Sequence, residues 1–220
     1  MNAQGKRSGE TAREYAYRMI REQVISLELK PGEAFNDMEF AAKIGVSRTP
    51  VREAVIQLSE ESRIIEIFPQ RGMRIAPIDV ELVEEARSLR VLLEKQIAGM
   101  CCEMATEEDI KWLQENVGLQ EFYMENSRPE MVMQLDDEMH HKLFMICHRE
   151  LTYGMCQKLA IHYDRIRSLS VNTVKDNTII EDHRKIIQFI AEHKKENAMA
   201  QMEKHLSRWQ LNEGKFRQEF

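Results

Sequence analysis

The sequence is poor in the residues and segments that would argue against a helical globular protein. Only 9 of its 220 residues are Gly and 5 are Pro, so few positions interrupt helices. No apolar run approaches the roughly 20 residues that a membrane-spanning helix needs. The first residues are polar and lack the apolar stretch of a secretory signal. We therefore expect a helix-rich chain that acts in the cytoplasm and has no membrane span.

Cysteine is also scarce. The chain has 4 Cys and no CxxC spacing, so neither a zinc motif nor a thioredoxin-like motif is indicated. Cytoplasmic proteins usually keep such thiols reduced. We expect reduced and mostly buried side chains at Cys101, Cys102, Cys147 and Cys156.

A net positive charge is missing, but the charge is unevenly distributed. The net charge is −6. Residues 1–76 hold 12 Lys and Arg against 11 Asp and Glu, whereas residues 77–220 hold 19 against 26. Binding to DNA needs only a local basic patch, and an acidic remainder keeps the rest of the molecule away from phosphates. The charge distribution therefore permits nucleic-acid binding by the N-terminal part.

The N-terminal part combines three predicted helices with a hairpin. Apolar residues at helical spacing indicate helices over residues 11–27 and 37–44. Ser47 is a good N-cap for a third helix. Alternating apolar residues within 65–75 indicate a two-stranded hairpin with a tight tip. This order is typical of a winged helix-turn-helix, which places its last helix in the major groove of DNA.

The remainder of the chain is predicted to be a separate helical domain. Pro77 ends the hairpin, so we expect a DNA-binding domain at 1–78, disordered over 1–8, and an all-helical domain at 79–220. The fold class is mainly α, with six antiparallel helices in the second domain. Predicted N-caps are Asp79, Thr106 and Ser127, and later helices are predicted over 150–170, 176–193 and 196–217.

The predicted third helix carries side chains suited to DNA. Arg48 and Arg52 lie four residues apart and so share one helix face. Arg can bind guanine with two hydrogen bonds or pair with phosphate. Ser47 and Thr49 are short hydrogen-bonding groups, and Arg71 lies at the tip of the predicted wing. The alternative is that Arg48 and Arg52 are a solvated surface pair.

The string LKPGEAFNDMEFAAKIGVSRTPVREAVIQLSEE, followed by PQRGMRI, resembles the DNA-binding domain of the GntR family of bacterial regulators. The resemblance covers most of residues 11–76, and its VSRTPVREA segment is highly specific. It implies contacts with double-stranded operator DNA by Ser47, Arg48, Thr49 and Arg52.

Three histidines and one aspartate of the second domain are candidate metal ligands. Asp136 and His140 are four residues apart on one predicted helix, so both can face one ion. An antiparallel bundle can bring His183 and His205 of later helices to the same place. Three imidazoles and one carboxylate suit Zn²⁺, Ni²⁺ or a similar ion. The alternative is that these are surface pairs or helix caps.

Residues 79–217 resemble the FCD ligand-binding domain of the FadR subfamily, in its shorter six-helix version. The matching motifs are Arg90 with Leu93-Glu94, Asp136-x3-His140-x2-Leu143, His183-Arg184-x-Ile186 and Lys204-His205-Leu206. The resemblance implies that Asp136, His140, His183 and His205 hold a divalent metal and that a small organic acid binds there. Candidate counter-charges for that acid are Arg90, Arg165 and Arg167, each of which can instead form salt bridges within the bundle.

These observations predict a homodimeric transcription regulator, a repressor or an activator, whose operator affinity a small effector controls. A dimer with two-fold symmetry is expected to bind an operator with two-fold symmetry. Alternative interpretations are a direct metal sensor, a purely structural metal, or a metal-dependent hydrolase that uses the same four residues. We expect no enzyme, because no general base follows the site in sequence and catalysis would leave the DNA-binding head unexplained.

Overall fold

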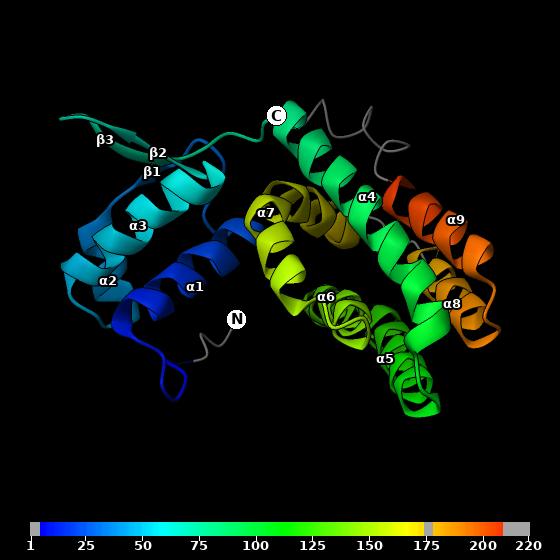
Figure 1. Cartoon of the computed structure of the whole chain (residues 1–220). Coiled ribbons are helices and arrows are strands. Elements are labelled where there is room, and N and C mark those ends of the chain that lie inside the picture. The colour runs from blue at the N-terminus through cyan, green and yellow to red at the C-terminus, as the bar shows by residue number, and fades with distance from the viewer. Residues whose placement is uncertain (1–4, 174–177, 209–220) are drawn as a thin grey trace. The chain divides into compact units, whose positions relative to one another are not determined.

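The computed structural model describes residues 5–173 and 178–208 (Figure 1). The chain divides into two compact units, Met1–Val80 and Glu81–Phe220. The described residues include no helix that is both long and apolar enough to cross a membrane. Three sequence predictions fall partly outside the described residues: disorder at 1–4, a helix start at 176 and a helix end at 217.

The first unit holds three helices and three short strands. Thr11 begins the first helix with a capping box, in which its side chain and that of Glu14 each bind the other's backbone N–H. The helix buries the apolar face that its periodicity predicts, including Ile20 and Val24. The elements are α1 (Ala12–Ile25), β1 (Ala34–Phe35), α2 (Asp37–Ile44), α3 (Arg48–Ser62), β2 (Ile65–Phe68) and β3 (Gly72–Ile75).

The predicted hairpin is part of a three-stranded antiparallel sheet. Its strand order is β1-β3-β2, so the central strand β3 pairs on both sides. Ala34 lies opposite Arg74 in the first pair, and Ile65 lies opposite Ile75 in the second. The expectation of two strands was therefore incomplete. A strand of two residues has no alternation that a sequence can reveal.

Backbone geometry fixes the two helices of the helix-turn-helix motif. Gly45 closes α2 at φ 73°, the left-handed conformation that glycine adopts at little cost. Ser47 is the N-cap of α3 as predicted, although its side chain makes no capping hydrogen bond. Val51, Val55 and Leu58 of α3 are fully buried, and α3 packs on α1 and α2. The opposite face of α3 is left to solvent.

The second unit is built of six helices among the described residues. α5 packs on α6 and α8, α8 packs on α9, and α6 packs on α7. The shared core includes Met139, Leu143 and Phe144 of α6 and Ile186 of α8. The helices are α4 (Val80–Met104), α5 (Glu107–Glu125), α6 (Pro129–Ile146), α7 (Glu150–Thr173), α8 (Thr178–Ala191) and α9 (Lys195–Leu206).

The predicted capping box at the start of α6 was wrong. The N-cap is Arg128, without a side-chain capping bond. Ser127 instead ends α5 in a left-handed conformation at φ 54°, where its N–H bonds Met124 and the next N–H bonds Tyr123. This is the Schellman pattern of helix termination. Ser127 therefore belongs to the C-terminal end of α5 and does not serve as the N-cap of α6.

The cap of α5 yields a stability prediction. Thr106 and Asp109 form a complete capping box, and replacing such a Thr by Ala typically costs about 1 kcal/mol. We expect Thr106→Ala to lower the free energy of unfolding by about that amount in urea titrations. Ser127→Ala is the control, because α6 begins at the N-cap Arg128 and the Ser127 side chain makes no capping hydrogen bond; its effect should stay within about 0.5 kcal/mol. Equal losses in both variants would contradict the assignment.

Candidate metal centre and DNA-binding surface

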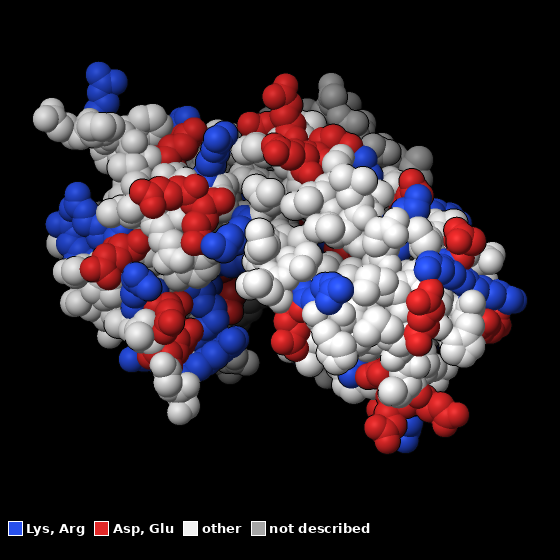
Figure 2. Space-filling model, viewed as in Figure 1, with Lys and Arg blue, Asp and Glu red and all other residues white. Residues whose placement is uncertain are grey.

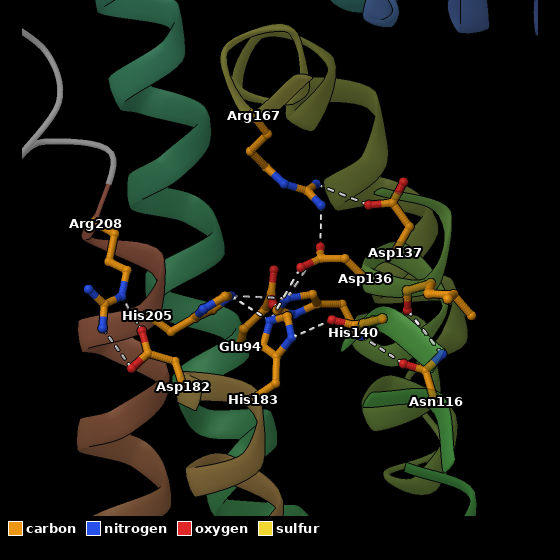
Figure 3. Close-up of polar contacts among 12 residues, drawn as sticks. Glu94, Asn116, Asp136, Asp137, His140, Arg167, Asp182, His183, His205 and Arg208 are labelled. Carbon is orange, nitrogen blue, oxygen red and sulfur yellow. Dashed lines mark hydrogen bonds and ion pairs between the residues drawn. The ribbon is translucent and has the colours of Figure 1, made fainter. Parts of the chain in front are cut away.

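Four candidate ligands from three helices meet inside the second unit (Figure 3). Asp136 and His140 come from α6, His183 from α8 and His205 from α9. One ligand atom from each lies within 4.8 Å of the others, and all four side chains are buried. The structure thus brings together all four residues that the sequence singled out.

The imidazole rings turn the same nitrogen toward the centre. Nε2 of His205 lies 3.3 Å from Nε2 of His183 and 3.3 Å from Nε2 of His140. Oδ1 of Asp136 lies 3.3 Å from Nε2 of His183. Nitrogens that each carry a lone pair gain nothing from facing one another, whereas a shared cation would satisfy all of them.

A chain of amide hydrogen bonds sets the tautomer of His183. The backbone carbonyl of Leu135 can only accept, and it accepts from the Asn116 side-chain amide at 3.1 Å. Oδ1 of Asn116 accepts from the Gln120 amide at 2.8 Å. Oε1 of Gln120 is left to accept from Nδ1 of His183, also at 2.8 Å. Nδ1 therefore carries the proton, and Nε2 presents its lone pair to the centre.

Glu94 of α4 plays the same part for His140. Its carboxylate contacts Nδ1 of His140 and accepts from Nε of Arg90 at 2.6 Å. Burial by itself would raise the pKa of Glu94, but Arg90 and His140 lower that pKa to about 2. The ionised carboxylate can only accept, so its contact with Nδ1 favours the tautomer that carries the proton there and leaves Nε2 as a ligand.

Arg167 of α7 orients the aspartate. It forms an ion pair with Oδ2 of Asp136 and donates to Asp164 at 2.7 Å and Asp137 at 3.0 Å. Burial opposes ionisation of Asp136, yet Arg167 and His140 lower the pKa of Asp136 well below its usual value. Oδ1 stays directed toward His183. The anionic ligand is thus charged and fixed before any ion binds.

His205 completes a donor set that fits a metal ion. Its Nδ1 has no hydrogen-bond partner among the described residues. Burial, with the neighbouring His183 and His140, lowers the pKa of His205 well below its usual value. Burial also lowers the pKa of His183, which Asp136 only partly offsets. Neutral imidazoles and an ionised carboxylate are the forms that bind metals.

The three candidate anion-binding arginines are not equivalent. Arg90 and Arg167 lie beside the four ligands and are already paired with protein carboxylates. Arg165 is fully buried, and burial lowers its pKa to about 10. A rotation of about 100° per helical residue turns Arg165 away from the side of α7 that carries Asp164 and Arg167. The structure therefore places two of the three near the centre.

The candidate DNA-binding residues are all exposed in the first unit. Ser47, Thr49 and Arg52 lie in the first turns of α3 or just before it. Nε of Arg48 donates to the buried Asp37 at 2.9 Å, while 55% of the Arg48 side chain stays exposed. Arg71 follows β2 in the hairpin, and Figure 2 shows a basic side chain projecting at the hairpin tip. Acidic side chains instead gather over the start of α4 in Figure 2.

Sequence reasoning missed the residues that orient the ligands. Asn116 and Gln120 are buried polar side chains on α5. They lie on the buried face of α5 together with Leu113, Val117 and Met124. Two amide side chains at positions where the helical pattern predicts apolar residues could therefore have indicated a buried polar role. Glu94 stood out only as part of the Arg90 with Leu93-Glu94 motif of the family resemblance, and its contact with His140 was not predicted, because an acid four residues after an Arg is also an ordinary helix pair.

Comparison with protein families identifies both parts of the chain. Residues 12–75 match the family described as bacterial regulatory proteins, gntR family. Residues 85–208, more than half of the chain, match the FCD domain. The chain is a GntR-family transcription regulator with an FCD domain. The predicted fold class, a winged helix-turn-helix joined to a helical domain, is confirmed.

Curated and solved relatives of this GntR-family chain agree. It is 28% identical over 204 residues to the HTH-type transcriptional repressor RspR of Escherichia coli K12, covering 92% of this chain and 89% of RspR. It is 26% identical over 185 residues to the Nta operon transcriptional regulator of Aminobacter aminovorans, covering 84% and 86%. Its fold matches E. coli McbR/YncC with a TM-score of 0.77 at 18% identity, covering 95% of this chain and 98% of that one.

The buried histidines predict how stability depends on pH. The pKa values of His183 and His205 are lowered in the fold, whereas a His in the unfolded chain titrates near 6.5. The unfolded state therefore binds more protons as pH falls below about 6.5, and stability decreases there. Glu94 contributes stability above its unfolded pKa of about 4.5, which is lost only as pH falls toward 2.

We expect the urea midpoint of the chelator-treated protein to fall between pH 7 and pH 5.5. The double variant His183→Gln/His205→Gln should lose most of that dependence, and His141→Gln should keep it. A midpoint in the wild-type protein that stays constant over this interval would contradict the neutral, buried state of the two rings.

Proposed function

We propose that the chain acts in the cytoplasm as a homodimer, with each α3 in the major groove of operator DNA. We further propose that an organic acid at a zinc or nickel ion in the FCD domain changes the operator affinity. The observation that carries the second proposal is the meeting of three imidazole Nε2 atoms and one carboxylate in a buried core.

The exposed face of α3 supports the DNA contact. Arg52 is solvent-exposed one turn after Arg48, and Asp37 holds the Arg48 guanidinium by its Nε. An oriented guanidinium loses less conformational freedom when it binds a base or phosphate. The N-terminal residues of a recognition helix are those that meet base edges. We assign Arg52 to base or phosphate contact and Ser47, Thr49 and Arg71 to the phosphate backbone.

The donor set supports a borderline divalent ion. Three neutral imidazoles and one carboxylate suit zinc or nickel better than magnesium or calcium, which prefer oxygen ligands. Gln120 and Glu94 hold the imidazoles in the required tautomer. Four protein ligands leave further coordination positions on an ion that accepts five or six ligands, and a carboxylate is a suitable occupant.

The charge around the centre supports an anionic effector. The buried charges that pair with one another around the four ligands are the carboxylates Glu94, Asp136 and Asp164 and the guanidinium groups of Arg90 and Arg167. They leave one formal negative charge, and a divalent ion would change this to one positive charge. A bound organic acid would offset that charge in a place where water is excluded. Arg90 and Arg167 are the counter-charges that we assign to it.

Exposed apolar side chains of the FCD domain support a dimer. Leu92 of α4 and Leu151 and Met155 of α7 are each more than half exposed. Figure 2 shows an area over the middle of α4 with little charge. A second copy would cover such side chains, and the paired α3 helices would then read a two-fold operator.

We propose no enzymatic activity for the centre. A hydrolytic metal site needs a general base close to the ion. Glu94 is buried and already engaged by Arg90 and His140, and Arg167 engages Asp136. Neither carboxylate is placed to take a proton from water.

Loss of Arg52 should weaken operator binding. We expect Arg52→Ala to cost about 1–3 kcal/mol if the guanidinium contacts a base, which is about 5- to 150-fold in Kd. The measurement is fluorescence anisotropy at fixed salt, with fragments that the wild-type protein enriches from random DNA. Arg149→Ala removes an exposed Arg of the FCD domain and should leave the Kd unchanged. An unchanged Kd in Arg52→Ala would overturn the assignment of α3.

Metal content and metal affinity should follow the four ligands and their supports. We expect about one equivalent of metal per wild-type chain and little in His183→Ala/His205→Ala. Gln120→Leu breaks the amide chain and should weaken zinc binding about 10- to 100-fold. Gln188→Leu is its control, because the side-chain amide of Gln188 donates to the exposed Glu192 just after α8, away from the amide chain. A metal-free wild-type protein that cannot be reloaded would contradict the centre.

The operator Kd, measured with chelator, with zinc, and with zinc plus acetate, succinate or citrate, separates the remaining interpretations. Coupling of about 1–3 kcal/mol that requires both zinc and an acid supports the proposal. An effect of zinc alone would indicate a direct metal sensor. Zinc that raises only the melting temperature would indicate a structural metal.

A further inference from the structure

Two cysteines far apart in sequence meet in the core of the FCD domain. Cys101 lies on α4, and Cys147 is the C-cap of α6. Their Sγ atoms are 3.5 Å apart, and both side chains are buried. Sγ of Cys101 also lies 3.4 Å from the carbonyl of Leu143, and Sγ of Cys147 lies 3.6 Å from that of Ile97. Each thiol is therefore held facing the other.

The pairing is selective among the cysteines. Cys102 follows Cys101 directly, but its Sγ contacts the carbonyls of Ala98 and Phe189 instead. A disulfide requires Cβ atoms that point toward each other, and adjacent helical residues point about 100° apart. Core thiols often serve only as small apolar side chains. That role does not require two sulfurs in contact.

The two thiols differ in reactivity and access. The contact between the two thiols lowers the pKa of Cys147, and the same contact together with burial raises the pKa of Cys101. Cys147 lies just beyond the last residue of α6, next to the exposed His148 and Arg149. Helix ends open locally at far lower cost than the middle of a core. A small oxidant would therefore reach Cys147 first.

We propose that Cys101 and Cys147 are an oxidation site, at which a hydroperoxide joins them in a reversible disulfide. The Cys147 thiolate attacks one oxygen of ROOH; the O–O bond breaks, ROH leaves with a proton, and Cys147 becomes a sulfenic acid. Cys101 then attacks the Cys147 sulfur, the S–S bond forms, and the oxygen leaves as water with the thiol proton. The two sulfurs lose two electrons, and the hydroperoxide gains them.

The disulfide would lie on the same helix pair as a contact of the metal centre. Glu94 precedes Cys101 by seven residues on α4, as His140 precedes Cys147. Seven residues are about two helical turns, so both pairs lie on one line of contact between α4 and α6, about 10 Å apart. The disulfide would fix these two helices together beside the Glu94–His140 contact. The oxidation itself does not depend on a bound metal.

The test is thiol mapping of the full-length protein. Wild type, Cys102→Ala/Cys156→Ala and Cys147→Ala are treated with hydrogen peroxide, unfolded, alkylated with N-ethylmaleimide and measured by intact and peptide mass spectrometry. We expect the double variant to lose both alkylatable thiols with a mass decrease of about 2 Da, and dithiothreitol to restore them. Cys147→Ala should form no disulfide within the chain.

Three results would overturn the proposal: oxidation of Cys147 to a sulfinic acid without pairing, a disulfide to Cys102 or Cys156, or thiols that peroxide leaves unchanged in the folded protein. Peptide mapping of the wild-type protein decides the matter even if a variant fails to fold. Native alkylation by iodoacetamide adds an independent measurement, in which Cys147 should react faster than Cys101.

Discussion

The candidate metal centre depends on one constraint at His183 and His140: each buried imidazole must direct the proton of its Nδ1 atom toward an acceptor that cannot donate a proton in return. The Leu135 carbonyl imposes this on His183 through Asn116 and Gln120, because each amide in the chain can face only one way. Glu94 imposes it on His140. Side chains of α4 and α5 thus decide which nitrogen atoms of α6 and α8 are available as ligands. The packing of these four helices therefore determines the ligand chemistry of the centre.

The same constraint explains where the buried charges lie. An ionised carboxylate in a core is expensive unless it is paired and hydrogen-bonded. Glu94 has Arg90, and Asp136 has Arg167, each within the same cluster of helices. Arg167 pairs with Oδ2 of Asp136, and Arg90 shares the Glu94 carboxylate with His140. Both carboxylates therefore stay ionised, and the Nε2 atoms that face the centre stay free of protons. Stability and ligand geometry are therefore supplied by the same four charged side chains.

Much of this was accessible from the sequence, and the exceptions have physical reasons. Helical spacing placed Asp136 and His140 on one face, and family motifs supplied His183 and His205. The amide chain was hidden because its two ends, the Leu135 carbonyl and His183, lie on other helices, which no local pattern links to residues 116 and 120. Ser127 was misread because the end of α5 competes for it, and β1 was missed because two residues show no alternation. Contacts between distant residues, such as Cys101 with Cys147, require the packed structure.

The pairing of Arg167 narrows how an acid effector can enter. Arg167 contacts three carboxylates, of which Asp136 and Asp164 are buried, while the Asp137 side chain is 43% exposed. An entering carboxylate that displaced a buried partner would strand a charge in the core, at a cost of several kcal/mol. Displacing Asp137 returns that side chain to water at little cost. An acid effector of the proposed kind would therefore exchange one carboxylate for another on Arg167, and the free energy that remained for switching would come mainly from its contacts with the proposed metal and Arg90.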